Sequence, residues 1–148
     1  MHPENKEKLE RRIIQAAHVT MGEQKYVSAI DILIRVGWLM PNSVKEWRLG
    51  RVDYLERRIQ ANLKKISYVM KFFRKWALEQ GLKPSQTVYL MRTKGSRQEL
   101  RFSKSGDPTI ETTYRTHYIS PELSETKQAK ILGKLNQSLC SGVGDRHR

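Results

Sequence analysis

The chain has 148 residues, of which 28 are Lys or Arg and 15 are Asp or Glu, and its formal net charge is +13 at pH 7. Its longest mostly apolar stretch, residues 29–40, contains two charged side chains and is too short to span a bilayer. The polar residues 1–6 have no signal-peptide core behind them, and the only cysteine, Cys140, excludes an intrachain disulfide. We therefore expect a soluble, cytoplasmic protein of one domain, without a cysteine-type metal site or a cofactor.

The positive charge is concentrated in about one third of the sequence. Residues 51–80 hold eight Lys and Arg against three acids, and residues 82–104 hold six against one, so each segment has a net charge of +5. Such a concentration is typical of a protein whose partner is rich in phosphate, because cationic side chains release the counterions condensed on phosphates.

The first part of the chain predicts three helices. Apolar residues at helical spacing indicate an amphipathic helix over residues 5–21. Residues 26–39 are apolar nearly all round, and their length and polar interruptions favour a buried helix, capped by Ser28, over a central strand. A turn then leads to a short helix over residues 44–49.

The clearest helical pattern covers residues 52–80. Its apolar positions step by three or four residues and are Val52, Leu55, Ile59, Leu63, Ile66, Met70, Phe73 and Ala77. This periodicity predicts one long helix, ended by Gly81, that forms the central spine of the domain.

Beyond the long helix the sequence period changes to two. Residues 87–92 and 99–103 are predicted to form the two strands of an antiparallel hairpin. Residues 110–118 predict a short helix with Glu111 and Arg115 paired across one turn.

The predicted fold class is mostly α with a small antiparallel β-hairpin (α+β). A last, weakly amphipathic helix is expected over residues 124–136, and residues 137–148 are expected to form a flexible tail. The single compact helical domain would then cover residues 1–136.

Four stretches resemble a family of small uncharacterised bacterial proteins. They are Val27–Leu33, Trp47–Glu56, Ser103–Pro108 and Tyr114–Tyr118. The resemblance covers residues 26–122 and implies a bacterial protein of one compact domain, with no activity, cofactor or site residue attached. The order of helices followed by a basic hairpin also resembles winged helix-turn-helix modules, which implies a helix in a nucleic-acid groove.

The predicted long helix carries a row of cations. Arg57, Lys64 and Lys71 recur every seven residues and Lys75 continues the row, with Arg58 and Lys65 beside it. The alternative is an ordinary solvated face, since Lys and Arg are good helix formers. No acid lies between Arg57 and Phe73, and this absence favours a functional basic face.

The predicted hairpin is also basic. Its cations are Arg92, Lys94, Arg97, Arg101 and Lys104, accompanied by the single acid Glu99. A cationic edge can also serve to prevent sheet aggregation, but five cations in thirteen residues exceed that need. Tyr89 is expected to be a half-buried strand residue.

Aromatic and titratable residues offer weaker candidates. Trp38 and Trp76 are expected in the core, whereas Trp47, between Glu46 and Arg48, is expected to be partly exposed. An acid, a base and a cation cluster near His117, through Asp107, Glu111, Arg115 and Tyr118. Their closeness in sequence supplies no catalytic geometry.

These patterns favour a non-catalytic nucleic-acid-binding protein, with DNA and RNA both open, that contacts phosphates through the basic helix face and the basic hairpin. One alternative is an adaptor or scaffold that docks an acidic protein partner. A second alternative is an enzyme centred on the His117 region.

Overall fold

The structure is a computed structural model that describes residues 3–91 and 98–121. The helix predicted over residues 124–136, the predicted tail 137–148 and the hairpin cations Arg92, Lys94 and Arg97 lie outside the described residues.

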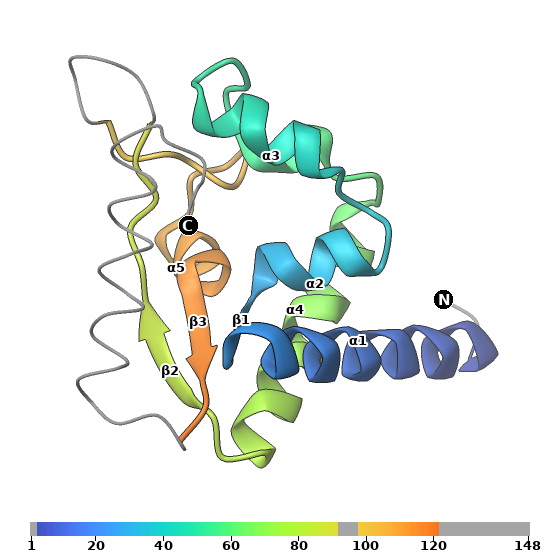
Figure 1. The fold of residues 1–148 in the computed structure, drawn as a ribbon. Coiled ribbons are helices and arrows are strands. Elements are labelled where there is room, and N and C mark those ends of the chain that lie inside the picture. Colours follow the sequence, from blue (N-terminus) through green and yellow to red (C-terminus); the bar gives the residue numbers. More distant parts are fainter. Residues whose placement is uncertain (1–2, 92–97, 122–148) are drawn as a thin grey trace.

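Helices dominate the described part of the chain, which also contains a small antiparallel sheet (Figure 1). The elements in chain order are α1 (Pro3–Gln24), β1 (Tyr26–Ser28), α2 (Ala29–Arg35), α3 (Pro41–Arg48), the 3-10 helix η1 (Leu55–Arg58), α4 (Leu63–Glu79), β2 (Lys83–Gln86), α5 (Pro108–Arg115) and β3 (Thr116–Ile119). The predicted α+β class is therefore confirmed. None of these helices is long and apolar enough to cross a membrane.

The sheet is not the predicted hairpin. Its strand order is β1-β3-β2, and both neighbours run antiparallel to β3. The helix predicted over residues 110–118 therefore ends at Arg115, and the next four residues form the central strand. Thr116–Ile119 is rich in β-branched and aromatic side chains, which suit a strand that is paired on both edges.

Between the two predicted hairpin strands the structure has one antiparallel bridge, Leu90 with Glu99. The reason lies in the backbone of residues 101–103, whose polar groups have other partners. The Arg101 carbonyl accepts from Leu55 N (3.3 Å), and the Phe102 carbonyl accepts from Glu56 N (2.9 Å). The ladder therefore stays short, with Met91 N donating to the Gln98 carbonyl (2.9 Å) and Leu100 N to the Tyr89 carbonyl (2.7 Å).

The first two helices follow the prediction in part. Ser28 is the N-cap of α2, as predicted, and it forms a capping box with Asp31. Residues 26–28, however, form β1, and α2 ends at Arg35 rather than at residue 39. Gly37 has a φ of +88°, a left-handed conformation that ends a helix and is open to glycine.

The prediction of a single long helix over residues 52–80 is wrong. The chain forms η1, continues with Ile59 in an extended conformation, and starts α4 only at Leu63. Gln60 N donates to the Trp38 carbonyl (2.7 Å), and the Asn62 side chain caps α4 by accepting from Lys65 N (2.9 Å). Tertiary hydrogen bonds and this cap replace the helical bonds of one predicted turn.

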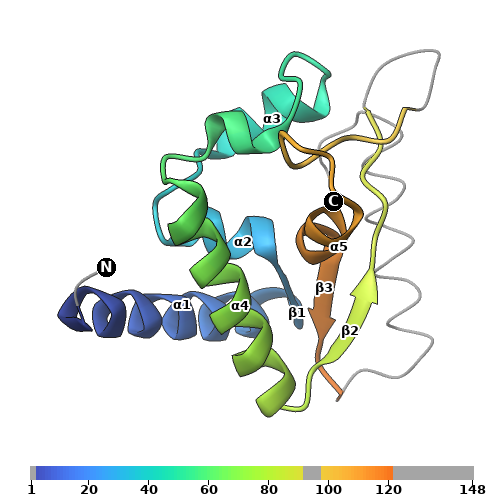
Figure 2. The ribbon, with the colours of Figure 1, turned by 180° about the vertical axis from the view of Figure 1, so that it is seen from behind.

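The core lies between the helices and the sheet. α1 packs against both α2 and α4, and β2 lies at the far edge of the sheet from α1 in both views (Figures 1 and 2). Trp47 is completely buried, with its ring centroid 4.9 Å from that of Phe102 and its Nε1 donating to the Arg101 carbonyl (2.8 Å). The expectation that Trp47 is partly exposed is therefore wrong, because its neighbours in space are aromatic.

The Asn62 cap offers a test of the helix boundary. We expect Asn62→Ala to lower the free energy of unfolding by about 1 kcal/mol, because the Lys65 amide loses its acceptor. Asn62→Asp keeps a side-chain acceptor and serves as the control. Urea denaturation followed by circular dichroism measures both, and equal midpoints for the Ala and Asp variants would contradict the cap.

Candidate nucleic-acid interface

The lysines of α4 divide into two faces. Lys64, Lys71 and Lys75 are exposed and lie on the side of the helix opposite its buried residues, which include Ile66 and Phe73. We call these three lysines the α4 basic face. The predicted line from Arg57 into this face does not exist, because the chain leaves the helical path between η1 and α4.

Lys65 is exposed but belongs to the flank of α4 that faces α1. It shares this flank with Trp76, whose ring makes an edge-to-face contact with His18 of α1. The structure thus separates Lys65 from the basic face with which the sequence grouped it.

The two basic segments of the sequence meet at Tyr54. The guanidinium of Arg57 lies 5.6 Å from the centre of the Tyr54 ring, and that of Arg101 lies 5.5 Å from it. Arg57 also lies 3.6 Å from Asp53, while Arg58 is exposed beside it on η1. The structure therefore brings the described end of the predicted basic hairpin next to η1.

Two carboxylates hold residues 102–104 in place beside η1 and α5. Glu111 of α5 is buried and accepts hydrogen bonds from Phe102 N (2.9 Å), Ser103 N (2.7 Å) and Ser103 Oγ (2.5 Å). Glu56 accepts from Lys104 N (3.0 Å) through one oxygen and from the Tyr114 hydroxyl (2.9 Å) through the other.

The predicted pair of Glu111 with Arg115 is consequently wrong. The Glu111 carboxylate turns inward to the backbone of residues 102–103, and Arg115 instead pairs with Glu99, with 3.0 Å between Nη1 and Oε1. Two acids near the basic segments thus serve the chain's own backbone and hydroxyl donors.

Several cations of the predicted site have no countercharge within the part of the chain that the structure describes. Within residues 3–91 and 98–121, no ion pair with a carboxylate is formed by Arg58, Lys64, Lys71, Lys75, Arg101 or Lys104. All six side chains belong to exposed residues. Unpaired, exposed cations of this kind are free to contact an anionic partner.

His117 lies inside the protein and not at a surface. It is 1% exposed, its Nε2 lies 2.7 Å from the Tyr89 hydroxyl, and its ring stacks parallel to that of Tyr26 at 5.9 Å. Burial, and secondarily the charge of Arg48, lowers the pKa of His117 to about 4. Tyr89, expected to be half buried, is fully buried against this imidazole. The enclosed position of His117 does not support an enzyme centred on it.

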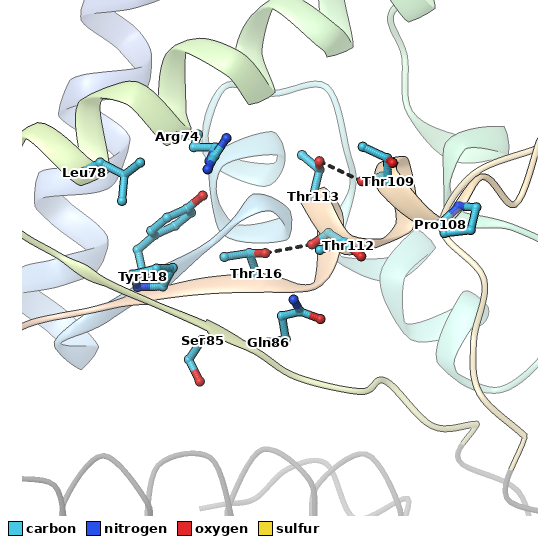
Figure 3. A pocket seen from close by; sticks show the side chains of 11 residues that line it. Arg74, Leu78, Ser85, Gln86, Pro108, Thr109, Thr112, Thr113, Thr116 and Tyr118 are labelled. Carbon is cyan, nitrogen blue, oxygen red and sulfur yellow. Dashed lines mark hydrogen bonds between the residues drawn. The ribbon is translucent and has the colours of Figure 1, made fainter.

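A groove runs between α4 and α5 beside the basic face. One half is a hollow of about 560 Å³ that β2 and β3 also line, and we call it the polar half because several hydroxyls lie in it (Figure 3). The other half, a more apolar hollow of about 410 Å³, we call the apolar half. Arg74, Thr109 and Thr113 line both halves. We call the two hollows together the α4–α5 groove.

Arg74 is the functional candidate that the sequence prediction missed. It extends toward the hydroxyl of Tyr118 (Figure 3). Its position three residues after Lys71 places it on the flank between the basic and the buried faces of α4. The helical spacing of the sequence could have placed Arg74 beside the basic face. It could not have predicted the groove, because the groove depends on where α5 packs.

Comparison with family models, with curated proteins and with solved structures finds no significant match for this chain. The two resemblances drawn from the sequence therefore stay predictions. Within the described ranges, no group of three or more His, Cys, Asp or Glu side chains is placed to hold a metal ion.

The Glu111 carboxylate gives a stability prediction. We expect Glu111→Ala to lower the free energy of unfolding by about 3 kcal/mol, because buried donors of residues 102–103 lose their acceptor. Glu79→Ala, at an exposed site on α4, is the matched control. Urea denaturation measures both variants, and similar midpoints would show that Glu111 does not hold this segment.

Buried His117 predicts a pH dependence of stability. Its pKa is about 4 in the folded state and 6.5 ordinarily, so the unfolded chain binds a proton first as the pH falls. The stability is therefore complete above pH 6.5 and falls by up to about 3 kcal/mol between pH 6.5 and 4.

We expect His117→Gln to remove much of this slope, and His18→Gln, at an exposed position on α1, is the comparison variant. Thermal or urea unfolding at several pH values between 4 and 7 measures the slope. A slope that is unchanged in His117→Gln would assign the pH dependence to another group.

Proposed function

We propose that this chain is a non-catalytic nucleic-acid-binding protein that contacts phosphate through one basic surface. The surface comprises the α4 basic face, Arg57 and Arg58 of η1, and Arg101 and Lys104. Lys65 lies on another flank of α4 and is left out of the proposed surface. The hairpin cations Arg92, Lys94 and Arg97, outside the described residues, extend the proposal from the sequence alone.

The observation that carries the proposal is the convergence of two basic segments on one ring. Arg57 and Arg101 both contact the Tyr54 ring, although they come from different segments of the chain. A solvated helix face needs no such convergence. It also usually carries acids at helical spacing, and the stretch between Arg57 and Phe73 has none.

The proposed mode of recognition is contact with the backbone of the nucleic acid. Lys and Arg that contact phosphates position a protein but carry no sequence information directly. No side chain of the surface is assigned to a base edge, and both DNA and RNA fit the chemistry. We propose a cytoplasmic location, since a single cysteine suits a reducing compartment.

Charge reversal tests the surface. We expect Lys64→Glu with Lys75→Glu to weaken binding by about tenfold or more and to reduce the slope of log affinity against log salt by about 2 on duplex DNA, since two phosphate contacts are lost. Arg101→Glu with Lys104→Glu should have the same effect. Fluorescence anisotropy of labelled duplex DNA, single-stranded DNA and structured RNA at two salt concentrations measures both quantities.

The control matches the change in net charge. Lys8→Glu with Arg11→Glu alters two exposed cations of α1 and should leave most of the affinity and the salt slope intact. If this control weakens binding as much as the other pairs do, the effect comes from net charge alone. An unchanged salt slope in either test pair would remove that segment from the surface.

A further inference from the structure

The α4–α5 groove follows one flank of α4 along most of its length. Leu63, Ser67, Met70, Arg74 and Leu78 recur every three or four residues and line its α4 wall. At a rise of about 1.5 Å per residue this wall is about 22 Å long, which corresponds to about four turns of a helix. The opposite wall is α5, continued at the polar end by residues of β2 and β3. A groove of this length along one helix has the shape that accepts another helix.

The apolar half of the groove exposes large side chains from both walls. Leu63 of α4 is 66% exposed and Ile110 of α5 is 40% exposed, and both line the same hollow of about 410 Å³. The buried side chains of Ile66, Met70 and Tyr114 also line it. Facing apolar side chains in a groove mark a surface that gains stability when it is covered.

The charges along the groove are positive. Lys71 and Arg74 line the apolar half, and Glu56 is its one carboxylate. Both oxygens of Glu56 accept hydrogen bonds, from Lys104 N and from the Tyr114 hydroxyl. The free charges that an occupant meets are therefore those of Lys71 and Arg74, and an acidic occupant is favoured.

The polar half of the groove presents hydrogen-bonding groups to an occupant. The hydroxyls of Thr113 and Thr116 donate to the carbonyls one turn earlier, so they present lone pairs to the hollow (Figure 3). Arg74 extends toward Tyr118 at this end, where it can also meet a carboxylate (Figure 3). The groove thus changes from apolar to polar along its length.

We propose that the α4–α5 groove docks an acidic amphipathic helix of a partner protein. Apolar residues of that helix, spaced by three or four positions, cover Leu63 and Ile110, and its carboxylates face Lys71 and Arg74. This inference rests on the groove and does not require the proposed nucleic-acid binding, although Lys71 belongs to both surfaces.

Two other occupants fit the groove less well. A second copy of the chain in a two-fold dimer would bring the Lys71 and Arg74 of each copy close to those of the other, which is repulsive. A nucleic-acid base would need an aromatic platform, and the only ring in the apolar lining, that of Tyr114, is 1% exposed.

The test uses a synthetic peptide of about four helical turns, with leucines at helical spacing on one face and glutamates on its flanks. We expect its labelled form to bind the full chain in fluorescence anisotropy. Leu63→Ser and Ile110→Ser should each weaken binding at least tenfold, and Arg74→Ala should weaken it and reduce its salt dependence. Val19→Ser, which removes a 42% exposed apolar side chain on α1, is the matched control and should leave binding unchanged.

Four outcomes would overturn the proposal. The first is equal binding of a peptide with lysines in place of the glutamates, which would mean that charge is not selected. The second is equal loss in the Val19→Ser control. The third is a dimer in sedimentation that Ile110→Ser dissociates, which would assign the groove to a second copy. The fourth is displacement of the peptide by a single-stranded oligonucleotide whose own binding is lost in Ile110→Ser.

Discussion

The segment from Arg101 to Lys104 is held in place by two carboxylates that accept its backbone amides. Glu111 accepts hydrogen bonds from the amides of Phe102 and Ser103, and Glu56 accepts one from the amide of Lys104. Amides in this position have no ladder partner, and leaving a buried donor without an acceptor costs about 1–3 kcal/mol. The placement of Arg101 beside Tyr54 depends on these bonds, because they tie the segment to both η1 and α5. The Trp47 indole reinforces it by donating to the Arg101 carbonyl.

This use of acids changes how the net charge should be understood. Glu111 is buried, both oxygens of Glu56 are occupied, and Asp31 closes the capping box of α2, where burial raises its pKa. Within the described residues these three carboxylates accept hydrogen bonds from neutral donors and form no ion pair with a Lys or Arg. The exposed cations on α4 and around Tyr54 are therefore not neutralised in pairs by these three acids, although the acids still count in the net charge.

Local patterns predicted what local interactions decide. The amphipathic helix α1, the Ser28 cap and the face shared by Lys64, Lys71 and Lys75 could be read from spacing and capping chemistry. The prediction of one long helix was wrong because the spacing of apolar residues indicates which residues are buried and does not by itself fix the backbone conformation. Val52, Leu55 and Ile59 are all buried, but on a path shaped by hydrogen bonds to Trp38, Arg101 and Phe102. The sequence also did not predict the central strand β3 or the burial of Trp47, because the partners of both are distant in sequence. The meeting of Arg57 and Arg101 at Tyr54 could not be predicted at all.

The two proposed surfaces share α4, and Lys71 stands at their border. It belongs to the basic face and also lines the apolar half of the groove. An acidic helix in the groove would place carboxylates near Lys71 and Arg74 and so reduce the positive potential available to a phosphate backbone on the adjacent face. Thermodynamic linkage makes this effect mutual, because a ligand that lowers the affinity for a second ligand is itself bound less tightly in its presence. If α4 offers one face to phosphate and a flank to an acidic partner, as proposed, it would couple the two ligands negatively, with no change in the fold required.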